Sequence, residues 1–513
     1  MKWRCEMSVT MWLIWGAVAL VLGMYWAWLL CGERWRRELE RWVPWAVWVV
    51  VTGVSLASVL THEPWRDELH TWLVTRDLSF GAMWHEMRFE GHVMLWQLVL
   101  HPFARAGCPP VTLGLVSWGI NSATVFWLML KGPFTPAEKV AVGLSCPFLY
   151  VQPVIARCYV LVTPVLFGLA ALWERRKEYP LVFGGLTALL ANTHLYLEGT
   201  AGVLFLVWVW EGWRKRLRGE APGWRYWAGA GLMAAGMAVA VAQVLPTLWE
   251  RSRGWGWSCG WVMDLLTFVL CGNSPLAWVA LPVVMVTTGV LAWRADRGVA
   301  VVYGVGILFM VAFSVFLYSG NVINRAVLWF YLLLFAMWAL AERIPGRWRV
   351  AVVLMTSLCL VRPELTLGDW RYEFDFMPKA CAFVQKELGE EAEVFINGDD
   401  HPSSVAAAYL ENLRDWRTGE RTGRMSLEFR KWRPMGEFGK CREEIFAREP
   451  WRESFVAMGY PGTEVGLSVE DLRSEEVEVL YQSPPSVFAN TGPLCVFRVH
   501  QRKESEKREE RGE

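Results

Sequence analysis

Two adjacent carboxylates, Asp67 and Glu68, stand in a short polar stretch that follows a long apolar run. Adjacent residues point to different faces of the element that holds them, so only one of the two is expected to face a given pocket. A carboxylate at a membrane surface, partly desolvated and near cations, can act as a general base. The alternative is a solvated helix that begins after Pro64, where the helix dipole favours acidic residues in the first turn. The local sequence leaves both interpretations open.

Two arginines stand at the ends of apolar runs. Arg157, followed by Tyr159, lies where two such runs meet, and Arg325 precedes a late run. An arginine can hold a phosphate or pyrophosphate through two parallel hydrogen bonds, which a lysine cannot match. Both arginines could instead be interfacial anchors whose side chains snorkel to lipid headgroups.

Histidines mark two further breaks in the apolar sequence. The stretch 192–198 interrupts an apolar run and carries His194 and Glu198, while His92 follows Gly91 at a second break. A His and a Glu at membrane level are costly unless they are paired or face water, which makes them candidates for function. A lone His is still more often structural than catalytic, and that alternative stays open.

The elements that must position these residues are apolar runs of membrane length. Of the 513 residues, 54% are hydrophobic and 34 are Trp, a composition seldom seen in a soluble globular protein. Several runs reach or approach the ~20 residues that span a bilayer, so we predict a mainly α, polytopic membrane helix bundle of about twelve spans. The predicted spans are 11–30, 42–60, 111–130, 140–153, 156–173, 181–195, 198–212, 226–246, 276–293, 299–318, 326–342 and 349–362.

Lys and Arg gather in alternate loops between these spans, and positive charge is retained on the cytoplasmic side. Simple alternation puts all of these loops inside if the stretch 93–106 is a juxtamembrane helix in the outer interface. The segments then expected outside are 61–110, the turns near 154, 196 and 322, the loop 247–275 and everything after about 363. The candidate residues therefore fall on one side of the membrane.

The composition changes at 363, where charge rises and helical and strand patterns begin to alternate. We predict a transmembrane module over 1–362, a small α/β extracytoplasmic domain over 363–501 and a disordered charged tail over 502–513. Helices are expected at 378–388 and 403–410, and strands at 393–396, 477–481 and 494–499. Cys381, Cys441 and Cys495 would allow one disulfide there. The net charge of +1 gives no indication of a nucleic-acid partner, and we expect none.

In their order and sidedness, these motifs resemble the glycosyltransferase C superfamily, membrane enzymes that use polyprenyl-phosphate sugars. The resemblance is to the bacterial relatives of protein O-mannosyltransferases and aminoarabinose lipid A transferases. The motifs that carry it are Asp67-Glu68-Leu69-His70-Thr71-Trp72, Gly91-His92-Val93-Met94-Leu95-Trp96, Ala156-Arg157-Cys158-Tyr159-Val160-Leu161 and Asn192-Thr193-His194. The chain departs from the pattern at Val93-Met94, where relatives have Pro-Pro, and at Ala326, where His often follows Arg.

The resemblance implies an inverting transfer of a sugar from a polyprenyl-phosphate donor to an extracytoplasmic lipid, glycan or protein, in a bacterial-type plasma membrane. Asp67 would be the base, with Glu68 beside it in the catalytic pair, and Arg157 or Arg325 would hold the lipid phosphate. The remaining implied substrate-binding residues are His92, Tyr159, His194 and Glu198. Some members of the superfamily use a divalent metal at the acidic loop residue, and the sequence leaves metal dependence open.

Two other functions compete with glycosyl transfer. The first is a transporter or flippase for a lipid-linked sugar, although the predicted spans lack charges near their middle and no inverted repeat is visible. The second is a non-catalytic scaffold whose outer domain binds a partner, which the departures at Val93-Met94 and Ala326 keep open. Substitution of Asp67 would be harmless in such a scaffold.

Overall fold

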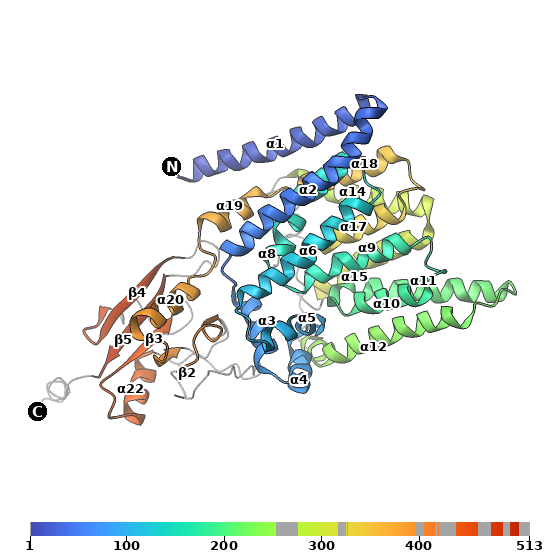
Figure 1. Ribbon diagram of the computed structural model, residues 1–513. Coiled ribbons are helices and arrows are strands. Elements are labelled where there is room, and N and C mark those ends of the chain that lie inside the picture. The colour runs from blue at the N-terminus through green and yellow to red at the C-terminus, as the bar shows by residue number, and fades with distance from the viewer. Residues whose placement is uncertain are drawn as a thin grey trace, which may run out of the picture. The chain divides into compact units, whose positions relative to one another are not determined.

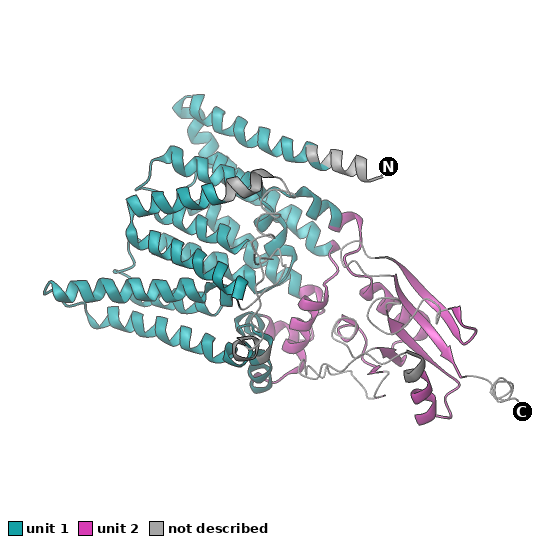
Figure 2. Cartoon of the chain, turned by 180° about the vertical axis from the view of Figure 1, so that it is seen from behind, with its two compact units in different colours: residues 1–60, 81–99, 113–368 teal, residues 61–80, 100–112, 369–513 magenta. Residues whose placement is uncertain are grey.

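A computed structural model describes residues 2–252, 275–316, 325, 327–396, 405–415, 419, 438–459, 473–485 and 493–501. The chain is mainly helical with a small C-terminal sheet (Figure 1). It divides into two compact units, coloured separately in Figure 2. The first unit contains 1–60, 81–99 and 113–368, and the second contains 61–80, 100–112 and 369–513. The stretch around Asp67 therefore folds with the C-terminal part of the chain.

Several sequence predictions fall on parts of the chain that lie outside the described residues. They are most of the loop 247–275, the turn near 322, the end of the span 299–318, the positions 403 and 404, the side chain of Cys441 and the tail 502–513. These predictions remain as they stand.

Each predicted apolar run overlaps helical backbone in the first unit. The helices there are α1 (Lys2–Leu30), α2 (Glu33–Thr61), α4 (Phe80–Glu90), α6 (Val111–Lys131), α7 (Pro136–Leu144), α9 (Val162–Leu172), α10 (Pro180–Ala191), α11 (Glu198–Leu217), α12 (Trp224–Ser252), α14 (Pro275–Ala295), α15 (Arg297–Phe316), α17 (Leu328–Ala339) and α18 (Gly346–Cys359), which α19 (Pro363–Arg371) follows.

Six helices in the described part of the chain are long and apolar enough to cross a membrane. They are Trp12–Leu30, Glu33–Thr61, Val111–Lys131, Trp224–Thr247, Arg297–Phe316 and Gly346–Arg371. Shorter apolar helices occupy Cys158–Leu172, Pro180–Ala191, Pro282–Ala295 and Leu328–Ala339. The length and composition of these helices are compatible with a membrane protein.

Helix α17 forms the centre of the first unit. All its side chains from Leu328 to Ala339 are buried, and it is apolar on every face, as is typical of a helix surrounded by protein. Phe167 of α9 and Trp173, which follows α9, contact its rings at Trp338 and Phe335. Arg325 therefore lies two residues before a stretch, from Val327 onward, that is buried throughout.

Helices α10 and α12 approach each other closely through small residues. A Cβ atom on Gly184 would lie 2.5 Å from the carbonyl oxygen of Gly229, so only glycine fits at this crossing. At the end of α10 the Asn192 amide donates to the carbonyl oxygen of Gly236 at 2.9 Å. This bond fixes the turn that carries His194.

The span predicted at 140–153 is wrong as a single helix. Helix α7 ends at Leu144, and a π-helical turn, η1 (Pro147–Val151), and the short α8 (Gln152–Val154) follow it. Proline lacks the N–H that a continuing helix requires, which explains a break at Pro147. The Asn121 amide of α6 donates to the carbonyl oxygen of Phe148 at 2.9 Å and holds the broken segment in place. The next run also begins irregularly, with the 3-10 turn η2 (Cys158–Leu161) before α9.

The second unit is built around a mixed five-stranded sheet of order β2-β1-β3-β5-β4. Strand β1 (Val394–Ile396) is parallel to β2 (Leu413–Asp415) and β3 (Ser454–Gly459), whereas β5 (Pro493–His500) is antiparallel to β3 and β4 (Val477–Pro485). The strands predicted at 393–396, 477–481 and 494–499 are β1, β4 and β5. The sequence did not predict β2 or β3.

The helices of the second unit are α3 (Arg66–Asp77), α20 (Met377–Phe383) and α22 (Phe438–Arg448), and α5 (Leu95–Arg105) contributes to both units. The helix predicted at 378–388 changes to a π-helical turn, η4, at Val384–Leu388. At 403–410, the described helical backbone is confined to 405 and 406.

Helix α3 is part of the core of this second unit. Its Leu69 and Leu73 are fully buried together with Met377, Val394 and Val496. Cys381 and Cys495 carry free thiols, so neither forms the disulfide that the sequence allowed.

Candidate functional site

A group of polar residues from separate segments of the first unit comes together, and we call it the cationic cluster. His92 follows α4, Arg157 lies between α8 and η2, His194 lies between α10 and α11, and Arg325 precedes α17. Tyr159 belongs to η2. These residues were all candidates from the sequence, and each stands at a break between helices.

Side-chain contacts connect the members of the cationic cluster one to the next. Arg157 Nη2 lies 3.4 Å from His92 Nε2, and the His92 ring centroid lies 6.0 Å from that of His194. The Tyr159 ring stacks on His194 at 4.7 Å, and Arg325 forms a hydrogen-bonding contact with the Tyr159 side chain. The cluster thus brings two guanidinium groups and two imidazoles around one tyrosine.

His194 provides a buried hydrogen-bond donor in this cluster. Its Nδ1 accepts a hydrogen bond from the Tyr196 backbone N–H at 3.2 Å. Because Nδ1 accepts this bond, it carries no proton, and the donor of the ring is Nε2–H. This N–H is buried and has no hydrogen-bond partner among the described residues. An anion could supply the acceptor oxygen for this N–H group.

Glu198, the remaining candidate from this stretch, begins α11. Its Oε1 is buried and has no hydrogen-bond partner in the described part of the chain. A hydroxyl group could donate to this oxygen, and the substrate-binding role of Glu198 stays a prediction.

The two candidate carboxylates at the start of α3 lie on different faces, as expected for neighbours. Glu68 is completely buried, and its Oε2 accepts from the Trp65 backbone N–H at 3.2 Å, which caps the helix. Asp67 is only half-buried, and its carbonyl oxygen accepts from Thr71. Glu68 is therefore held inside the protein, whereas Asp67 is the more exposed member of the pair.

A buried histidine that sequence reasoning missed joins this region, and we call Asp369, His62 and Glu68 the His62 network. His62 Nε2 lies 3.1 Å from Glu68 Oε2, and its Nδ1 lies 3.1 Å from Asp369 Oδ1. Burial opposes the charged ring, but the charges and hydrogen bonds of Glu68 and Asp369 outweigh it and raise the pKa of His62 to about 10. No local sequence signal pairs His62 with a residue so far along the chain.

Among the residues that the structure describes, no three His, Cys, Asp or Glu side chains form a group that could hold a metal ion. A divalent metal at Asp67, which the sequence left open, thus has no ligand set in the part of the chain that the structure describes.

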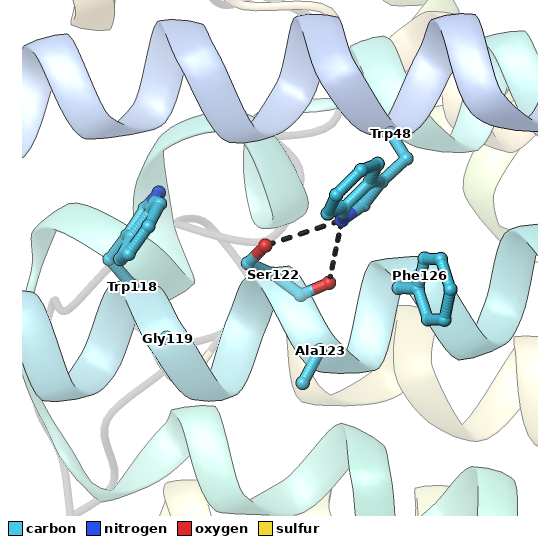
Figure 3. A pocket seen from close by; sticks show the side chains of 6 residues that line it. All are labelled: Trp48, Trp118, Gly119, Ser122, Ala123 and Phe126. Atoms are coloured by element: carbon cyan, nitrogen blue, oxygen red, sulfur yellow. Dashed lines mark hydrogen bonds between the residues drawn. The ribbon is translucent and has the colours of Figure 1, made fainter.

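An apolar pocket of about 350 Å³ lies between α2 and α6 (Figure 3). The Trp48 indole N–H donates to Ser122, and the Trp118 indole N–H donates to the carbonyl oxygen of Thr52. The lining residues are Trp48, Trp118, Gly119, Ser122, Ala123 and Phe126. Because these residues include no titratable group, the pocket offers apolar contact and no acid–base chemistry.

Neither the protein-family models nor the curated proteins compared with this chain include a match.

Proposed function

We propose that this protein is a membrane glycosyltransferase that moves a sugar from a polyprenyl-phosphate donor to an extracytoplasmic lipid, glycan or protein. The observation that carries the proposal is the cationic cluster, in which the buried Nε2–H of His194 stands among Arg157, Arg325 and His92. A phosphate supplies the acceptor oxygens that such donors bind.

The position of the cluster in a helix-rich, apolar unit favours a phosphate that belongs to a lipid. Breaks between apolar helices surround it, and six helices of the described chain are of membrane-crossing length and composition. An arginine guanidinium group can donate two parallel hydrogen bonds to phosphate oxygens. Its positive charge also stabilises the negative charge that develops on the phosphate as it leaves. In this proposal the full bundle has about twelve spans, a number that includes the shorter apolar helices.

The proposed reaction needs one base and one stabilised leaving group. Asp67 takes the proton from the acceptor hydroxyl while the oxygen of that hydroxyl forms a bond to the anomeric carbon of the sugar. The bond between that carbon and the phosphate oxygen breaks, and the lipid phosphate leaves with the electron pair, stabilised by Arg157, Arg325 and His194. Attack opposite the leaving group inverts the anomeric configuration without a covalent intermediate. Positioning of donor and acceptor supplies much of the rate.

The test compares membranes that contain matched amounts of wild type, Asp67→Asn, Arg157→Gln and the control Arg175→Gln. Arg175 lies in an exposed turn, where it pairs with Glu178. We measure the turnover of polyprenyl-phosphate sugars, the glycan profile of the envelope and the affinity for the donor. Loss of the base should lower turnover by roughly 100-fold or more with donor binding retained. Arg157→Gln should weaken donor binding, and Arg175→Gln should behave as wild type.

Two outcomes would contradict the proposal in different ways. A product that survives Asp67→Asn would remove Asp67 as the base. Membranes with and without the wild-type protein that show the same donor turnover and the same glycan profile would contradict the transferase itself.

A further inference from the structure

The His62 network lies entirely within the second unit, and none of its residues was given a part in the bond-making steps described above. Its three side chains are all buried, and each nitrogen of the His62 ring faces a carboxylate oxygen at 3.1 Å. Carboxylates accept hydrogen bonds, so both ring nitrogens donate and the ring is an imidazolium. Glu63 also lies near His62, and its carboxylate accepts from the Phe374 backbone N–H at 2.8 Å.

This network ties the first turn of α3 to a distant segment of the chain. Glu68 Oε2 accepts from the backbone N–H of Trp65 as well as from His62. The Phe374 ring packs on both His62, at 4.7 Å, and Trp65, at 6.2 Å. Asp67 stands between Trp65 and Glu68 in the sequence, so its backbone is held on both sides.

We propose that His62 is a positioning residue that fixes the direction of the Asp67 carboxylate by holding Glu68 and Asp369. This inference rests on the proposed function for its catalytic meaning. It gives the two neighbouring carboxylates different roles. Glu68 contacts His62 and holds the first turn of α3, and Asp67, oriented by that turn, is the base.

The rest of α3 is anchored independently of His62. Leu69 and Leu73 are fully buried in the core of the second unit, and Thr75 Oγ1 donates to the carbonyl oxygen of Thr71 within the helix. Loss of the imidazolium should therefore loosen the first turn and leave the helix docked. This separates a positioning role from general unfolding.

The test uses His62→Gln and, as a matched control, His101→Gln in the full-length protein. His101 also belongs to the second unit, but its Nδ1 lies 3.3 Å from a backbone carbonyl oxygen, that of Thr75, instead of a carboxylate. The first readout is the kcat of the transfer and the KM for the donor. A displaced base should lower kcat by roughly 10- to 100-fold with the donor KM unchanged.

The second readout does not depend on activity. A water-soluble carbodiimide with an amine labels accessible carboxyl groups, and mass spectrometry measures the rate at Asp67 and at the exposed Glu220. His62→Gln should speed labelling of the half-buried Asp67 several-fold and leave Glu220 unchanged. His101→Gln should leave both rates and kcat unchanged. If His62→Gln fails to fold, Asp369→Asn takes its place, since it removes one of the two carboxylates that hold the His62 ring. It should raise the labelling rate of Asp67 and lower kcat in the same directions, by smaller factors, because the contact between His62 and Glu68 remains.

A folded variant with wild-type labelling of Asp67 would overturn the positioning role, whatever its kcat. A wild-type protein that transfers no sugar, combined with faster Asp67 labelling in His62→Gln, would contradict the proposed function and support the positioning of Asp67. The two proposals therefore fail by different results.

Discussion

Raising the pH should destabilise the protein through His62. The pKa of this residue is about 10 in the folded chain against the ordinary 6.5. A rise of this size corresponds to roughly 5 kcal/mol of tighter proton binding in the folded state, as an order of magnitude. Because the folded pKa is the higher one, this contribution is complete below about pH 6.5 and is lost as the pH rises through about 10. Within that window the free energy of unfolding should fall by about 1.4 kcal/mol per pH unit.

The assay is thermal unfolding of the purified, detergent-solubilised protein between pH 6 and 10, followed by tryptophan fluorescence. At pH 7, His62→Gln should melt at a lower temperature than wild type, since breaking a buried ion pair costs about 3–5 kcal/mol. Its melting temperature should then depend less on pH, and the difference from wild type should narrow toward pH 10. His101→Gln should follow the wild-type curve.

Parallel curves for wild type and His62→Gln across this range would refute the reasoning. They would show that His62 carries no proton-linked stability, and that the contacts with Glu68 and Asp369 do not hold a charged ring.

Further predictions concern the packing of the first unit. Gly184→Ala should destabilise the protein by about 1–3 kcal/mol at the crossing of α10 and α12, because the added Cβ would lie 2.5 Å from the Gly229 backbone. The control Gly185→Ala should be neutral or stabilising, because a Cβ there would have no neighbour within 4 Å. Glu138→Ala should cost about 3–5 kcal/mol, since it removes the carboxylate that lies 3.1 Å from the mostly buried Arg349. Thermal unfolding of each variant beside wild type checks both, and unchanged melting of Gly184→Ala or Glu138→Ala would contradict the corresponding prediction.

The sequence predicted much of the cationic cluster because its members share one property. His92, Arg157, His194 and Arg325 all stand at breaks between apolar runs, and the predicted alternation of those runs places these breaks on one side. The structure joins these four residues through His92 and Tyr159 contacts. The hydropathy of a single sequence is enough to find such breaks.

The His62 network could not be predicted in the same way. His62 and Asp369 lie 307 residues apart, and a single sequence has no signal for a contact at that separation. The spacing of Leu69 and Leu73 predicts an apolar helix face, but it does not tell which core that face enters. The stretch 61–80 belongs to the C-terminal unit because Leu69 and Leu73 pack into the core of that unit.

The short and broken helices of the first unit have a physical reason that bears on function. A helix of 12 residues such as α17 is roughly 18 Å long, less than the ~30 Å hydrocarbon core. Irregular backbone is tolerated at membrane depth only where protein covers it or where it lines a watery cavity. In the proposed membrane bundle the break before α9 and the turn before α11 are irregular segments of this kind, and Arg157 and the buried His194 make polar contacts there. In that bundle, the breaks that make the span count hard to predict are also the places that can hold an anion.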